Sequence, residues 1–251
     1  MMSDDRPPGT LRLEISPDNP NTVDYSEDLF ASGEWERRGG RKQTETFARF
    51  FHRHIRVPYT GEFSVLDVGC ALGDAVKIWK RRYPAARLTG YDISPTAIDR
   101  ATRDYGSIAT FRQGSFEEIR GSYDVVFCSN VLEHFEQHVA IASHLLSHCR
   151  TLYVMTPYAE MEGGRPLTPR PGGIHVATFL EDSFDALKEN LAAKIETRVI
   201  RCPKAWGPSI PGEILWHLRY FLGLINPPSP LRRQIIYTIS NTGNPRSAID
   251  G

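Results

Sequence analysis

Short strand-forming runs alternate with amphipathic stretches along the middle of the chain, and this alternation predicts the fold class. The runs lie at 65–68, 87–92, 108–112, 123–128, 151–155, 195–202 and 235–240. Apolar residues recur at three- and four-residue steps after residue 73 and within 94–105, 136–147 and 179–191. Strands that alternate with helices in this way are typical of a doubly wound α/β domain with a buried parallel sheet.

The chain of 251 residues is long enough for one large α/β domain with additions. Residues 1–22 hold four prolines and few apolar side chains, which predicts a flexible amino-terminal arm. We expect residues 23–251 to form a single domain. An amphipathic pattern over 41–56 belongs to an expected helical cover at 23–57. A proline-rich stretch at 203–230 is expected as an insertion before the final strand.

Composition and charge exclude some function classes. Thirty basic and thirty acidic residues cancel, so the total charge gives no electrostatic footprint for nucleic acid. Four scattered cysteines, without a CxxC pair, predict buried reduced thiols of a cytoplasmic protein and no zinc site or disulfide framework. The polar amino terminus lacks the pattern of a signal peptide. The apolar stretch at 214–225 is interrupted by polar residues and too short to span a bilayer.

The first strand ends at a glycine-marked turn that carries a candidate ligand site. Gly69 and Gly73 flank Cys70 and Ala71, and an amphipathic helix follows. A strand–turn–helix of this kind places small residues where a ligand approaches the backbone closely. Asp67 adds a carboxylate at the carboxyl end of the strand, the edge at which parallel sheets bind their ligands.

The stretch VLDVGCALGD at 65–74 resembles the first motif of the class I S-adenosylmethionine-dependent methyltransferases, an acid, one residue and then Gly-x-Gly-x-Gly. Ala71 replaces the middle glycine. Three further motifs follow in the expected order, and the resemblance covers about 60–156. It implies a Rossmann-like α/β sheet of seven strands, mostly parallel with the last strand antiparallel, and helices on both faces. The helical cover would either close the cofactor cleft or pack on the outside of the sheet.

The resemblance places S-adenosylmethionine at the ends of the first four strands. Asp92 is implied to accept hydrogen bonds from the ribose hydroxyls, although an acid before Ser94 could also serve as a cap. Asp67 would bind the ammonium of the amino-acid head. Adenine would lie at 114–116, where Ser115 stands in place of a frequent Asp. The predicted cofactor-binding residues are Asp67, Gly69, Cys70, Ala71, Gly73, Asp92, Ile93, Gly114, Ser115, Phe116, Ser129 and Asn130.

The fourth motif, CSNVLEHF at 128–135, resembles the small-molecule branch of the family and lies beside the expected position of the methyl group. Transfer to a hydroxyl needs a base, and histidine is a suitable one. The candidates are His134 and, in a Gly/Pro-rich loop at 157–177, His175; either could instead be structural. The residues predicted to contact the substrate are Glu133, Tyr158 and Trp206.

We therefore predict a methyltransferase that acts on an oxygen or nitrogen of a small molecule, by analogy a sugar or natural product. A dinucleotide oxidoreductase is disfavoured because the turn lacks the third glycine of that fingerprint. No metal is expected, because the fourth strand lacks the clustered Asp/Asn ligands of the catechol-type branch. A catalytically silent binding subunit and an enzyme acting on a macromolecule remain alternatives, as do a monomer and a homodimer.

Overall fold

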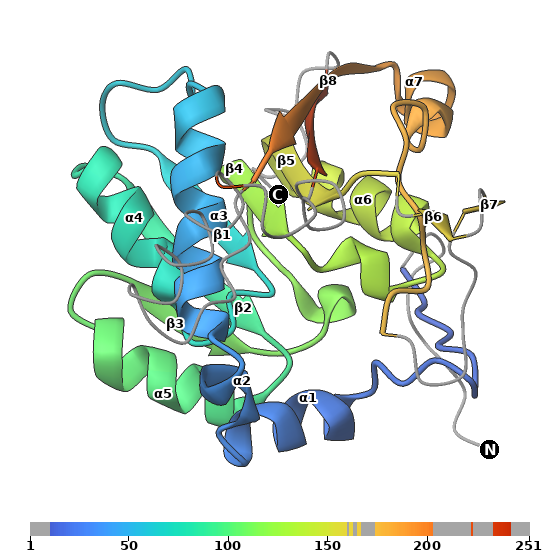
Figure 1. Ribbon diagram of the computed structural model, residues 1–251. Helices are drawn as coiled ribbons and strands as arrows, with labels where there is room; N and C mark the ends of the chain where they lie inside the picture. Colours follow the sequence, from blue (N-terminus) through green and yellow to red (C-terminus); the bar gives the residue numbers. More distant parts are fainter. Residues whose placement is uncertain are drawn as a thin grey trace, which may run out of the picture.

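The computed structural model describes residues 11–159, 161–162, 165–166, 174–202, 222 and 233–241. Seven of its strands are β1 (Ser64–Val68), β2 (Arg87–Asp92), β3 (Thr110–Gln113), β4 (Tyr123–Ser129), β5 (Cys149–Pro157), β8 (Ala193–Arg201) and β9 (Arg233–Asn241). They form one sheet in the order β3-β2-β1-β4-β5-β9-β8 (Figure 1). Strand β9 is antiparallel to both of its neighbours, and the other six share one direction. The predicted Rossmann-like topology is confirmed.

The helices are α1 (Val23–Ala31), α2 (Glu34–Arg37), α3 (Gly40–His54), α4 (Asp74–Arg82), α5 (Pro95–Tyr105), α6 (His138–Ser147) and α7 (Asp185–Leu191). Two short 3₁₀ helices, η1 (Phe116–Glu118) and η2 (Leu132–His134), follow β3 and β4. Strands β6 (Met161–Glu162) and β7 (Arg165–Pro166) form a separate two-stranded sheet. None of the helices in the described ranges has both the length and the apolar character of a membrane span.

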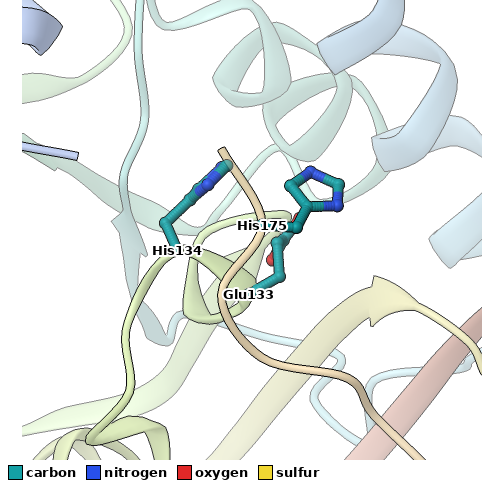
Figure 2. Close-up of side chains that lie close together, drawn as sticks. All are labelled: Glu133, His134 and His175. Atoms are coloured by element: carbon teal, nitrogen blue, oxygen red, sulfur yellow. The ribbon is translucent and has the colours of Figure 1, made fainter. Parts of the chain in front are cut away.

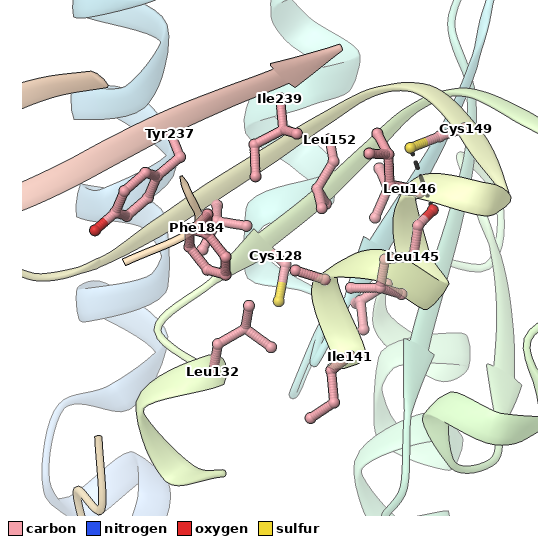
Figure 3. Packing of buried hydrophobic residues seen from close by; sticks show 14 of the residues in the cluster. Cys128, Leu132, Ile141, Leu145, Leu146, Cys149, Leu152, Phe184, Tyr237 and Ile239 are labelled. Atoms are coloured by element: carbon pink, nitrogen blue, oxygen red, sulfur yellow. Dashed lines mark hydrogen bonds between the residues drawn. The ribbon is translucent and has the colours of Figure 1, made fainter. Parts of the chain in front are cut away.

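Alternate residues of the central strands face two different cores. Leu66 of β1 packs into one core with α6 and α7, which Figure 3 shows from close by. Its neighbour Val65 faces the other core, where α3 and α4 contribute the fully buried Phe51 and Trp79. Because both faces are covered, β1 and β4 are almost continuously apolar. The four cysteines are buried and unbridged, as predicted.

Two helix predictions can be compared with their observed starts. Helix α5 begins as expected, with the Ser94 hydroxyl accepting from the Ala97 amide at 3.0 Å. The helix predicted over 179–191 is wrong in its first half, because α7 begins only at Asp185. The Leu180 amide donates to the Ser183 hydroxyl at 2.8 Å, which closes a turn in place of helical hydrogen bonds.

The amino-terminal segment differs from the predicted flexible arm over 11–22, whereas residues 1–10 lie outside the described ranges. Leu11 is buried in the α6 and α7 core. Asn19 is also buried, and its amide donates to the backbone oxygen of His134 at 3.0 Å. Prolines prevent regular helix here but do not prevent docking through side chains.

Candidate active site

The turn after β1 is tied to the end of β2. The amides of Gly69 and Cys70 donate to the backbone oxygen of Tyr91 at 2.8 and 3.1 Å. Gly69, Ala71 and Gly73 all adopt positive φ, at 70°, 49° and 79°. Ala71 therefore occupies the left-handed conformation that favours glycine, at the position where the family motif has its middle glycine.

The two glycines of the turn are also required by packing within the chain. A Cβ on Gly69 would lie 2.3 Å from Val131 Cγ2, and one on Gly73 would lie 3.0 Å from Phe111 and Tyr105. The sequence predicted that small residues here admit a ligand. The structure adds that the two glycines also leave room for side chains of the chain itself, including Val131 in the turn that follows β4.

Asp92 is buried at the carboxyl end of β2 and fixes two backbone segments. Its Oδ2 accepts from the Ala71 amide at 2.8 Å, and its Oδ1 accepts from the Ser94 amide at 3.1 Å. Burial raises the pKa of Asp92, and these hydrogen bonds oppose the rise. The capping role considered from the sequence is therefore present, and each carboxylate oxygen keeps a lone pair for a further donor. Ile93 follows half-buried, with its oxygen accepting from Gln113 Nε2 at 3.1 Å.

Asp67 contrasts with Asp92 because part of its carboxylate has no partner. The residue is 5% exposed, and its Oδ2 is buried without a hydrogen bond in the described part of the chain. Burial, assisted by the charge of Asp92, raises the pKa of Asp67 to about 8. An unpaired buried carboxylate is costly. A ligand ammonium would remove that cost, so this residue fits the amino-acid head of S-adenosylmethionine.

A cavity of about 60 Å³ opens beside Asp67. Six predicted cofactor residues line it, namely Asp67, Gly69, Cys70, Ala71, Ser129 and Asn130. Gln43, Thr44 and Phe47 of α3 close it, and Trp35 of α2 joins them. Helix α3 thus both covers the site and packs on the sheet. The sequence alone leaves these two roles of the helical cover as alternatives. Small-molecule pockets measure roughly 300–1,000 Å³, so a whole nucleoside needs this cover to move.

The predicted adenine residues lie beyond Asp92 and outside the cavity lining. The Gly114 amide donates to the backbone oxygen of Asp92 at 3.0 Å, which places this loop beside the carboxyl end of β2. Ser115 forms a capping box at the start of η1. Phe116 packs edge-on against Phe135, with ring centroids 5.1 Å apart, so its ring already has a partner within the protein.

Glu27 of α1 is a residue at this edge that sequence reasoning missed. Its carboxylate accepts from the Ser94 hydroxyl at 2.6 Å and also from Thr96, and these bonds lower the pKa of Glu27. The contact fixes α1 to the start of α5, next to Asp92. No local signal could have revealed it, because the partners lie 67 and 69 residues apart in the chain.

The turn after β4 holds a second buried carboxylate, that of Glu133. This residue is 1% exposed, and its Oε2 accepts from the Thr156 hydroxyl at 3.1 Å. Its backbone oxygen accepts from the amides of Val176 and Ala177 at 2.8 and 3.1 Å. Burial raises the pKa of Glu133, and the neighbouring imidazoles of His134 and His175 oppose this rise.

The two predicted bases meet at this turn. The rings of His134 and His175 lie with centroids 5.2 Å apart. Figure 2 shows that Glu133 and His134 come from one turn, while His175 comes from the segment that crosses it. His134 Nδ1 lies 2.7 Å from the backbone oxygen of Ile174. Since a carbonyl can only accept, Nδ1 carries a proton in this contact, and in the neutral ring the lone pair is then on Nε2.

Residues 65–151, which carry β1 to β5 and both buried carboxylate turns, match the family described as "Methyltransferase domain". The segment is a methyltransferase domain. Its sheet order is that of the predicted fold.

Relatives and solved structures agree with this assignment of the methyltransferase domain. Trans-aconitate 2-methyltransferase of Deinococcus radiodurans is 27% identical over 94 residues, which cover 38% of this chain and only 36% of that relative. Magnesium protoporphyrin IX methyltransferase (ChlM) from Synechocystis PCC 6803, with bound SAM, superposes with a TM-score of 0.58 at 16% identity, covering 92% of this chain and 100% of that one. The plantazolicin methyltransferase BamL superposes with a TM-score of 0.52 at 19% identity, covering 87% of this chain and 91% of that one. At these identities the structures show a shared fold.

Two of the predicted substrate residues remain to be placed. The Tyr158 hydroxyl donates to Glu181 at 2.6 Å, and the Arg233 guanidinium lies 4.8 Å from the centre of the Tyr158 ring. The tyrosine is thus engaged by surface charges and does not line the cavity. Trp206 and nearly all of the predicted insertion at 203–230 lie outside the described residues.

Proposed function

We propose that this protein transfers a methyl group from S-adenosylmethionine to an oxygen or nitrogen of a small molecule. The observation that carries the proposal is the unpartnered buried oxygen of Asp67, a residue that lines a cavity together with the glycine turn. An electrically uncompensated acid at this edge of the sheet suits a ligand with an ammonium group.

The cofactor would supply a methyl group on a positively charged sulfur. Asp67 would bind its ammonium, and Asp92 would accept from its ribose hydroxyls while still holding the amides of Ala71 and Ser94. Phe47 and Trp35 would exclude water from the reacting centre. The chain's contribution is therefore mainly to align and desolvate the reactants.

The acceptor would bind on the side of Glu133, at the turn after β4. His134 presents the lone pair of Nε2, so it can take a proton from an acceptor hydroxyl, and His175 lies within reach to share that role. An amine acceptor would need only to be unprotonated and held in line. Both cases place the two imidazoles beside the acceptor.

A sugar or another natural-product metabolite is the acceptor class that we favour. The names of the similar proteins support a small molecule, since they refer to trans-aconitate, magnesium protoporphyrin IX and plantazolicin. The four unbridged cysteines fit work in a reducing compartment such as the cytoplasm.

Binding of S-adenosylhomocysteine, measured by titration calorimetry, tests the cofactor half of the proposal. Asp67→Asn should weaken binding by about tenfold or more, since one charge-assisted contact is worth about 1.5–3 kcal/mol. The control is Asp99→Asn, the same change at an exposed position of α5. Equal affinities of all three proteins would exclude a role for Asp67 in binding.

Methyl transfer to a panel of hydroxyl and amine acceptors tests the other half. For any acceptor that is methylated, His134→Asn combined with His175→Asn should lower kcat by about 100-fold or more, because general bases contribute on that scale. Binding of S-adenosylhomocysteine should change less than twofold. An unchanged kcat in the double variant would remove both histidines from the mechanism.

A further inference from the structure

The side chains of Glu133, His134 and His175 form a compact donor set. One ligand atom from each residue lies within 4.8 Å of the other two. Metal–ligand bonds near 2.1 Å allow ligand atoms to be up to about 4.2 Å apart, so shifts of less than an ångström would bring all three onto one ion. One carboxylate and two imidazoles form a set that binds divalent transition metals and leaves open coordination positions.

The Nδ1 contact of His134 suits metal binding through Nε2. Its Nδ1–H donates to the backbone oxygen of Ile174, which directs the lone pair of Nε2 away from that carbonyl. Metal-bound histidines usually donate their second ring N–H to a carbonyl or carboxylate in this manner, because the bond fixes the ring and raises its basicity. His134 is also partly exposed, so an ion can reach it from solvent.

The backbone around the three residues is held by hydrogen bonds from distant parts of the chain. Thr156 donates to the Glu133 carboxylate, and the Val176 amide donates to the Glu133 backbone oxygen. Asn21 donates to the backbone oxygen of Ile174 at 2.8 Å, while the buried Asn19 donates to that of His134. The turn and the crossing segment are thus fixed relative to each other before any ion binds.

We propose that Glu133, His134 and His175 bind one divalent first-row transition-metal ion. The sequence predicted no metal because β4 lacks clustered acids; here the ligands come instead from η2 and from a segment 40 residues later. The acceptor role of the ion rests on the proposed function: an open coordination position would hold the acceptor oxygen and lower the pKa of its hydroxyl. With the ion bound, the lone pair of His134 Nε2 is on the metal, so the imidazoles act as ligands in place of a general base, and the hydroxyl proton leaves to water.

Metal binding can be measured without turnover. The full chain, freed of metal with a chelator, is titrated with Co²⁺ and followed by visible absorption, and then with Zn²⁺ by calorimetry. We expect one ion per chain, with Zn²⁺ displacing Co²⁺. Glu133→Gln, His134→Asn and His175→Asn should each weaken binding by at least about tenfold, with circular dichroism confirming that each variant is folded. Asn19→Ala, which removes a supporting contact, should weaken it less than the ligand variants do.

A second pair of histidines provides the control. The rings of His144 and His148 lie 4.8 Å apart on the far end of α6, where they too could attract a metal. His144→Asn combined with His148→Asn should leave Co²⁺ binding unchanged. Loss of binding in this control, or retention in all three ligand variants, would overturn the proposed site.

The outcome is separable from that of the proposed function. Binding of S-adenosylhomocysteine should survive removal of the metal and each ligand substitution. If the nucleoside binds and Co²⁺ does not, the metal site is wrong and the proposed function stands. If Co²⁺ binds and the nucleoside does not, the metal site stands and the proposed function fails.

Discussion

Strands β1 and β4 are neighbours in the sheet, and each leads to a buried carboxylate, but the two carboxylates are held in opposite ways. Asp67 has an unpartnered oxygen and a second acid, Asp92, as its electrostatic neighbour. Glu133 accepts from Thr156 and has two imidazoles near it. The first arrangement lacks positive charge and suits a cationic ligand. The second already provides donors and resembles a site for metal or acceptor chemistry.

The two regions meet where Gly69 contacts Val131, and Gly69→Ala should break this contact. The left-handed conformation and the clash with Val131 together should lower the free energy of unfolding by about 3 kcal/mol. Chemical denaturation measures this. Gly121→Ala is the matched control, because Gly121 also has positive φ but has open space around it.

The clash contribution can be tested further with Val131→Ala. In that background Gly69→Ala should cost no more than Gly121→Ala does. If the double variant is as unstable as the additive sum of its single changes, Val131 is not the group that requires glycine at position 69.

The raised pKa of Asp67 can be tested through the pH dependence of the protein's stability. Because the folded-state pKa is raised to about 8 from an ordinary value of 3.8, the folded protein holds this proton more tightly than the unfolded chain. Stability is therefore lost as pH rises from about 4 to 8. Asp67→Asn should be more stable than the parent at pH 8.5, by on the order of 2 kcal/mol, and this advantage should vanish toward pH 4.

Thermal unfolding of both proteins across this pH range provides the measurement. Saturating S-adenosylhomocysteine should reduce the advantage of Asp67→Asn at pH 8.5, because its ammonium compensates the acid. A difference between the two proteins that is independent of pH would contradict the assigned ionisation of Asp67.

The smallest expected effect concerns Ala71, which holds the amide that donates to Asp92. Ala71→Gly should relieve the left-handed strain but increase the entropy of the unfolded chain, for a net gain of about 0.5 kcal/mol. Ala159→Gly, at the same φ of 49°, is the matched comparison. A loss of stability specific to Ala71→Gly would show that its methyl group packs favourably in the turn.

The sequence predicted the arrangement around the glycine turn better than the arrangement around the turn after β4, for a physical reason. Asp67, the glycine turn and Asp92 follow consecutive strands, so parallel-sheet topology alone brings them to one edge. Strand periodicity also located β2 at its observed bounds, 87–92.

The acceptor side depends on contacts between segments that are distant in the chain. Asn19 approaches His134 from 115 residues away, and His175 reaches Glu133 across the end of β5. Asparagines in a proline-rich segment predict turns and loops, and nothing local indicates where their amides donate. For this reason His134 and His175 are two separate candidates in the sequence, and only the fold shows that they meet.

We propose above all that a nucleoside cofactor binds at the ends of β1 and β2 with its ribose on Asp92. The most direct test is titration calorimetry of S-adenosylhomocysteine against the parent protein, Asp92→Asn and the exposed control Asp99→Asn. We predict saturable binding at one site per chain, a loss of about tenfold to 100-fold in affinity for Asp92→Asn, and no change for the control. Affinity for folded Asp92→Asn equal to that of the parent would contradict the account.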